Sequence, residues 1–128
     1  MPRFDVDVQK SGPLFDGRAR LAVRQFVKAA EEEIAEVGAR QVRQQLGRVL
    51  RQPTGYYQSN IHAVQSSGSW EVNDNGVVYG PWLEGTGSRN RTTRFKGYHT
   101  FRLVSQNVDR QSSRIAETVL TRYLPRMQ

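Results

Sequence analysis

The sequence predicts an α+β fold in which helices pack on one face of a small antiparallel sheet. Two long segments, residues 18–50 and 98–125, carry apolar residues at helical spacing. The stretch 56–79 between them is rich in β-forming residues and is interrupted by turn signals. A chain of 128 residues has the length of one domain, and 37% hydrophobic residues are enough for one core. We therefore expect a single domain over residues 1–128.

A short strand is predicted at the N-terminus. Phe4, Val6 and Val8 alternate with polar residues, which is typical of a half-buried strand. Ser11, Gly12 and Pro13 end this pattern, and a helix can begin at Asp16 or Gly17.

The longest periodic segment predicts a helix over residues 18–50. The gaps of three and four in its first apolar stripe place these residues on one helix face: Ala19, Val23, Phe26, Ala30, Ile34 and Val37. The next apolar set is Val42, Leu46 and Val49, and the gap of five beside Gly38 indicates a bend or a change of packing partner. Gln52-Pro53 ends the helix, because the residue before proline disfavours the α region.

Residues 56–79 predict an antiparallel meander of three strands, with the N-terminal strand added at an edge. The segment contains Tyr56, Tyr57, Ile61, Val64, Trp70, Val72, Val77, Val78 and Tyr79, which are β-formers. Asn75-Gly76 between apolar residues is a strong hairpin signal.

Residues 85–97 have no periodicity and predict a long, mobile basic loop. They contain four basic residues and no acidic one. A second helix then follows from about Tyr98 and ends at Pro125.

Composition narrows the possible partners and compartments. The formal net charge of +7 comes mostly from arginine, and it favours an anionic partner such as nucleic acid or an acidic protein surface. A basic surface without a specific partner is the alternative. The chain has no cysteine, which excludes disulfides and cysteine-ligated metal. It shows neither a signal peptide nor an apolar run of membrane-spanning length, so we expect a soluble protein with no membrane partner.

Catalytic residues are scarce. His62 and His99, with nearby arginines, are the residue types that small basic nucleases use to cleave RNA by general acid–base chemistry. Surface positions without a role are the alternative for both histidines. No paired carboxylates, P-loop, serine motif or metal-ligand cluster accompanies them. We expect no enzyme, no metal and no cofactor.

The basic loop is the main candidate for binding. Its cationic side chains could neutralise phosphates while Phe95 stacks on a base, or they could dock into an acidic groove of a neighbouring subunit: Arg89, Arg91, Arg94 and Lys96. A solvated loop without a specific contact is the third possibility. Trp82, just before the loop, is interpreted either as core or as a packing site for a neighbouring subunit.

Two motifs resemble a known family. Tyr79-Gly80-Pro81-Trp82-Leu83-Glu84-Gly85-Thr86-Gly87 resembles the Tyr-Ala-x-Tyr-Val-Glu-Phe-Gly-Thr segment of the phage head–tail joining, or tail-completion, family. Upstream, Pro53-Thr54-Gly55-Tyr56-Tyr57-Gln58-Ser59-Asn60-Ile61 is similar to the Pro-x-x-Thr-Gly-x-Leu-x-x-Ser-Ile of that family. The order of helix, Thr-Gly junction, meander and Glu-Gly-Thr also agrees, over residues 18–87.

The resemblance implies a virion structural protein of the head–tail interface. Such a protein assembles in the host cytoplasm as a closed homo-oligomeric ring around the DNA channel. Its partners are the neighbouring connector or stopper, the tail-tube or terminator proteins, and the genomic DNA in the lumen. The resemblance gives Thr54, Gly55, Tyr79, Trp82, Glu84, Gly85 and Thr86 structural roles. The alternative function is a small basic nucleic-acid-binding or RNA-cleaving protein, and a tail-tube or tail-terminator subunit differs from the first only in its place in the particle.

Overall fold

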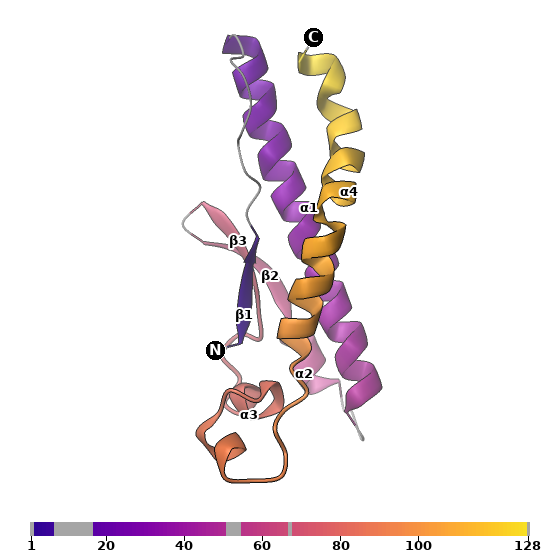
Figure 1. The fold of residues 1–128 in the computed structure, drawn as a ribbon. Helices are drawn as coiled ribbons and strands as arrows, with labels where there is room; N and C mark the ends of the chain where they lie inside the picture. Colours follow the sequence, from indigo (N-terminus) through magenta and orange to yellow (C-terminus); the bar gives the residue numbers. More distant parts are fainter. Residues whose placement is uncertain (1, 7–16, 51–54, 67, 128) are drawn as a thin grey trace.

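Two long antiparallel helices and a small sheet make up the molecule. The computed structural model describes residues 2–6, 17–50, 55–66 and 68–127. Helix α1 (Gly17–Val49) and helix α4 (Thr100–Met127) lie side by side along their length (Figure 1). The sheet packs against α1, and the chain between β3 and α4 forms the end of the molecule opposite the C-terminus (Figure 1). The α+β prediction is therefore confirmed.

The sheet has three strands in the order β1-β3-β2, with both pairs antiparallel. Strand β1 (Arg3–Val6) joins β3 (Ser69–Asn73), and β3 also pairs with β2 (His62–Ser66). The prediction that the N-terminal strand is added to an edge is confirmed. It starts at Arg3, and Val8 lies outside the described residues.

The core lies between α1, α4 and the inner face of the sheet. Alternation directs Phe4, Val6, Trp70 and Val72 to that face. Gly38 allows the sheet to come close to α1, because a Cβ there would lie 2.6 Å from Cζ of Phe4. The shift in the apolar pattern near Gly38 thus marks a change of packing partner within one continuous helix.

The stripe expected on the first half of α1 is only partly right. Ala30 and Ile34 are buried as predicted, but Val23, Phe26 and Val37 are only half-buried. The side chain of Ala19 lies outside the described residues. Small residues are buried instead: Ala22, Ala35 and Ala39. The physical reason is that α1 is packed on two sides, by the sheet and by α4, so its contact surface is wider than one stripe.

The three-strand meander predicted for residues 56–79 is wrong, because the described residues of this stretch form only two strands, β2 and β3. Tyr56 and Tyr57 begin a helical turn, α2 (Tyr56–Ser59), rather than a strand. The only hairpin among the described strands joins β2 to β3 near Gly68, at φ +83°. Asn75 and Gly76 do form a turn with positive φ, but the chain continues into α3 (Gly80–Glu84) instead of another strand. Pro81 has no N–H for a strand ladder and favours the first turn of a helix.

The helix ends also differ slightly from the prediction. Helix α1 ends at Val49, and Pro53 lies outside the described residues. Helix α4 continues to Met127 and contains Pro125. Proline this close to a helix end removes only one backbone hydrogen bond of the last turn, so the helix is not interrupted.

Candidate functional site

The basic loop has its own folded structure, which consists of a base and a tip. The base consists of residues 81–87 and 97–102, and the tip consists of residues 88–96. Helix α3 starts the base, and the carbonyl of Pro81 accepts the backbone N–H groups of Gly85, Thr86 and Gly87 at 2.9–3.1 Å. One carbonyl therefore fixes the first turn of the loop.

Glu84 joins the base to the start of α4. Its carboxylate accepts the backbone N–H groups of Phe101 at 2.8 Å and Arg102 at 3.1 Å. These two groups belong to the first turn of the helix, which has no partner within the helix for its N–H groups. The positive end of the helix dipole also favours a carboxylate at this place. Glu84 is buried, so this residue of the family-like motif caps a helix rather than facing a partner.

Two glycines close the base. The backbone at Gly85 and Gly97 has φ of +101° and +95°, which favours glycine. A Cβ on Gly97 would overlap the backbone of Gly85, and a Cβ on Gly85 would overlap the carbonyl of Lys96. Two backbone hydrogen bonds join the two ends of the loop. Tyr98 N donates to the carbonyl of Leu83 at 2.7 Å, and His99 N donates to the carbonyl of Glu84 at 3.2 Å.

The tip is folded around Asn90, which is buried. Its side-chain oxygen accepts the N–H of Gly87 at 2.9 Å, and its amide donates to the carbonyls of Trp82 and Phe95, both at 3.1 Å. Asn90 belongs to a 3-10 helix, η1 (Ser88–Arg91). A loop with close ends and its own internal hydrogen bonds is an Ω-loop. This order was not predicted, because residues 85–97 show no periodicity.

Lys96 and Phe95, predicted to face a partner, are used inside the loop. The ammonium group of Lys96 donates to the carbonyls of Asn90 at 2.8 Å and Arg91 at 3.3 Å. The ring of Phe95 packs against Trp82 and Tyr98, with centroid distances of 5.0 Å in both cases. The ring of Phe95 is therefore engaged with two other rings, while Lys96 holds two loop carbonyls and is still exposed to solvent.

The three arginines of the tip remain available. Arg89, Arg91 and Arg94 are exposed, and within the described part of the chain their guanidinium groups have no hydrogen bond or ion pair. No acidic residue lies between positions 85 and 97. The folded tip thus presents three guanidinium groups from six consecutive residues on a backbone held by internal hydrogen bonds.

The other motif residues are placed as follows. Thr54 lies outside the described residues, and Gly55 precedes α2 with φ +87°. Trp82 is half-buried and belongs to the aromatic group under the tip, so it is neither central core nor free surface. Thr86 is exposed, and Tyr79 is exposed with its ring against Tyr57 at 5.6 Å.

A buried carboxylate that sequence reasoning missed braces the approach to α3. Asp74 is fully buried; it accepts the hydroxyl of Tyr57 at 2.9 Å and the N–H of Gly76 at 3.0 Å. Gly80 packs directly on this carboxylate, because a Cβ there would overlap it. Burial, and then the contact with Asp74, raises the pKa of the Tyr57 hydroxyl above its usual value. An aspartate before Asn-Gly looks like an ordinary turn residue, so the sequence does not distinguish it.

The two histidines occupy different parts of the fold. His62 is exposed at the start of β2, while the ring of His99 lies against Gly85 in the loop base. Among the described residues, no group of three or more His, Cys, Asp or Glu side chains is placed to hold a metal ion. Within those same residues, none of the helices has the length and apolar character needed to cross a bilayer.

Comparison of the chain with protein-family models, with curated proteins and with solved structures finds no match.

Proposed function

We propose that this chain is a non-enzymatic structural protein of a tailed-phage particle, a subunit of a closed ring at the head–tail interface through which DNA passes. The observation that supports the proposal is the construction of the loop. The motif that resembles the head–tail joining family forms its base, and that base carries a rigid tip with Arg89, Arg91 and Arg94 free. A preorganised tip loses little conformational entropy when it docks.

The chemistry of the tip favours contact with an extended anionic surface. Three guanidinium groups attract phosphates or carboxylates over a distance of about 8–10 Å at physiological salt. Phe95 already packs against two rings of the loop, so the exposed arginines are the groups best placed for DNA, and their contacts would be to the backbone. A subunit that lets DNA pass needs attraction of this weak, salt-screened kind rather than tight recognition of sequence.

The copy number in purified particles tests the proposal. We expect quantitative mass spectrometry of the source phage to find this chain at the level of one ring for each portal. Hundreds of copies would instead indicate a tube or capsid subunit. Absence from the particle would refute the structural role and would leave the alternative, an RNA-cleaving or nucleic-acid-binding protein, to be tested by His99→Ala in a cleavage assay.

The role of the tip is tested separately by charge removal. We expect the triple variant Arg89→Gln/Arg91→Gln/Arg94→Gln to reduce the yield of joined, infectious particles. The matched control is Arg110→Gln/Arg114→Gln/Arg122→Gln, which removes the same charge from exposed positions of α4. Equal losses for the two variants would show that net charge matters, and not the loop.

A further inference from the structure

The two edges of the sheet differ in what protects them. An edge strand offers unpaired N–H and C=O groups, and proteins normally protect it with charge, proline or a covering element. Strand β2 at one edge consists of His-Ala-Val-Gln-Ser, with no lysine, proline, glycine or acidic residue. Its midpoint, Val64, is 37% exposed. Among the described residues, β2 is therefore the unprotected edge.

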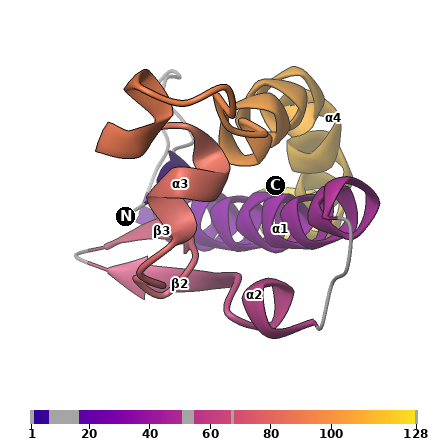
Figure 2. The ribbon, with the colours of Figure 1, turned by 90° about the horizontal axis from the view of Figure 1, so that it is seen from below.

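The other edge, β1, lies beside an open groove. Helix α1 packs against all three strands, whereas α4 packs against α1 and reaches the sheet at β1. Viewed from below, α4 lies on the β1 side of the molecule (Figure 2). Two adjoining hollows of about 210 and 630 Å³ lie between β1 and α4, and both are lined by Phe4, Ser105 and Gln106. The helical layer thus extends past the sheet at this edge.

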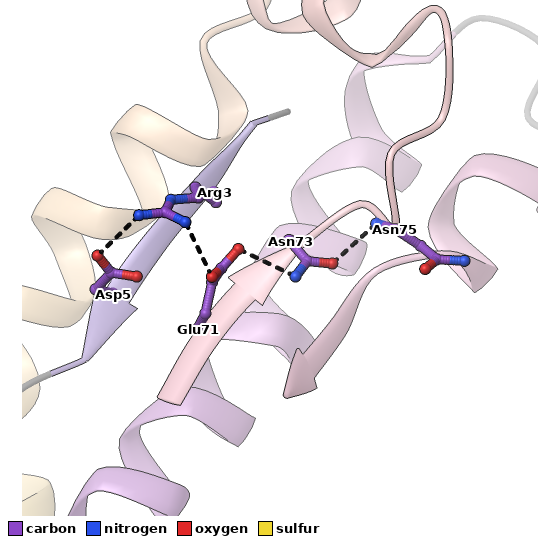
Figure 3. Close-up of polar contacts among 5 residues, drawn as sticks. All are labelled: Arg3, Asp5, Glu71, Asn73 and Asn75. Carbon is purple, nitrogen blue, oxygen red and sulfur yellow. Dashed lines mark hydrogen bonds and ion pairs between the residues drawn. The ribbon is translucent and has the colours of Figure 1, made fainter. Parts of the chain in front are cut away.

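Polar contacts fix β1 on the sheet and leave its edge charged. Arg3 contacts Glu71 at 3.2 Å and Asp5 at 3.5 Å, and Glu71 accepts a hydrogen bond from the amide of Asn73 at 3.1 Å (Figure 3). Both Arg3 and Asp5 are more than half exposed. A neutral strand such as β2 can approach this edge without like-charge repulsion.

The register shows which backbone groups of β1 and β2 point away from β3, and among the described residues no strand pairs with these groups. Ser66 and Ser69 are register partners across a two-residue connection, so they form a hydrogen-bonded pair. Along the antiparallel ladder, hydrogen-bonded and non-hydrogen-bonded pairs then alternate, which makes Ala63 and Val72 a non-hydrogen-bonded pair. It follows that Ala63 directs its N–H and C=O to the free edge of β2. By the same alternation through β3, Arg3 and Asp5 direct theirs to the free edge of β1.

We infer that β2 of one copy pairs in parallel with β1 of the next copy, along the edge that borders the groove. The inference rests on the proposed ring, since a contact between two different edges is heterologous and can close a ring. Strands β1 and β2 are both antiparallel to β3 and so run in the same direction. A rotation about an axis along the strands preserves this direction and makes the new pair parallel.

The same rotation fixes the register of the contact. The rotation does not shift a residue along the axis. Val64 and Asp5 are both register partners of Glu71, so these three residues lie at the same position along the axis. Val64 then lies beside Asp5 of the next copy, and Ala63 lies beside Phe4. In a parallel pair, Ala63 bonds to the residues on either side of its neighbour, Arg3 and Asp5, which are the ones whose backbone groups are free.

The inner face of β2 stays against its own copy, because α1 packs against β2 and Ala63 packs on the core. On that face β2 has Ala63 and Gln65, one small and one polar. The side of α4 that lines the groove carries Ser105, Asp109 and Ser112 at helical spacing, together with the apolar Val108. The contact between copies therefore rests on the backbone groups of the two edges, and not on burial of β2 side chains under α4.

Disulfide trapping tests the contact in a chain that has no cysteine of its own. In the variant Asp5→Cys/Val64→Cys the two positions of one chain are separated by β3, about 9.6 Å apart, which is too far for a disulfide within the chain. Oxidation of purified particles should therefore link neighbouring copies into a ladder that ends at the size of the ring. The control Val64→Cys/Arg114→Cys, with one cysteine away from the sheet, should give no ladder.

The outcomes separate this inference from the proposed function. Unlinked chains in particles that contain the variant would overturn the inference and leave the ring intact. Dimers from Val64→Cys alone would also overturn it, since they indicate β2–β2 pairing. If the chain is absent from particles, the proposed function fails, and oxidation of the concentrated purified protein decides the contact: a ladder supports it and unlinked chains refute it.

A second variant tests the backbone pairing without a new bond. Ala63→Pro removes an N–H that points to the free edge and leaves the ladder with β3 intact, which edge strands tolerate. We expect a folded monomer that is not incorporated into particles. Normal incorporation would contradict pairing along β2.

Discussion

The base and the tip of the basic loop are built from different interactions. In the base, Glu84, Gly85 and Gly97 are fixed by backbone hydrogen bonds and by direct backbone contact. In the tip, Arg89, Arg91 and Arg94 contact solvent, and their guanidinium groups bond to none of the described residues. The tip is nevertheless ordered, through Asn90 and Lys96.

This difference separates stability from binding. A change in the base is expected to cost folding free energy, because it disturbs buried groups that are already satisfied. A change to the three arginines is expected to leave folding unchanged and to affect only contacts with a partner. The predictions below, from the largest effect on stability to the smallest, test whether the boundary lies where the structure puts it.

The largest effect is expected for Gly97→Ala in the base. The new Cβ meets the backbone of Gly85, and φ at this position is +95°. We expect a loss of about 2–5 kcal/mol in the free energy of unfolding, measured by chemical denaturation. The control is Gly55→Ala, where φ is +87° but, among the described residues beyond its chain neighbours, no atom lies within 4 Å of the new Cβ. Its expected loss is about 1–2 kcal/mol, from backbone strain alone. Equal losses would show that the close approach in the base is unimportant.

Glu84→Ala should remove the cap of α4. It leaves the N–H groups of Phe101 and Arg102 without their acceptor, at a cost of about 2–3 kcal/mol in the free energy of unfolding. The control Glu36→Ala, at an exposed position of α1, should change this quantity by less than about 0.5 kcal/mol. A similar result for both variants would contradict the capping role.

Tyr57→Phe tests the brace that leads into the base. It leaves the buried Asp74 without its hydroxyl donor and should cost about 1–3 kcal/mol at neutral pH. The raised pKa of Tyr57 adds a pH dependence. Its stabilisation is complete below the usual pKa of 10.0 and is lost as the pH rises above it, because the unfolded chain then releases the proton that the native state retains. Denaturation between pH 8 and 11, the range around that value, should therefore show a smaller alkaline loss in Tyr57→Phe than in wild type. Parallel pH profiles would refute this.

Asn90→Ala should act on the tip more than on the whole fold. It removes three hydrogen bonds that close the loop. If loop closure loses about 1.4 kcal/mol, opening becomes about tenfold more frequent, and trypsin should cut after the tip arginines about tenfold faster. Cleavage at the wild-type rate would mean that Asn90 does not hold the tip.

The smallest effect on stability is expected for Arg89→Gln/Arg91→Gln/Arg94→Gln. Because these side chains are exposed, the midpoint of denaturation should correspond to a change of less than about 0.5 kcal/mol. Lys96→Met, in the same loop, should cost about 1 kcal/mol, since it removes bonds to two carbonyls. A large loss of folding free energy for the triple variant would show that the three arginines contribute to folding, as the residues of the base do.

Much of the fold was predictable from local patterns. The two long helices and the N-terminal strand follow from the spacing of apolar residues, and the structure has all three. The errors lie where a local signal has more than one tertiary outcome. Asn75-Gly76 predicts a turn, and the turn exists, but the buried contacts of Asp74 lead the chain into α3 instead of a hairpin.

For the candidate site, the sequence located the basic loop but not its organisation. It predicted that Lys96 and Phe95 face a partner, and the structure uses both within the loop. The functions of Asn90 and Asp74 were not predicted at all. Side chains that act on backbone groups several residues away leave no periodic signal, so spacing rules do not find them.

The sequence by itself determined the α+β class, the presence of the two long helices, the excess of positive charge and the position of the loop. These properties depend on composition and on the period of apolar residues, which are local. The tertiary structure decided which loop residues are free, which carboxylates are buried and which edge of the sheet is unprotected. These properties depend on contacts such as those of Glu84 with the start of α4, between residues distant in the chain.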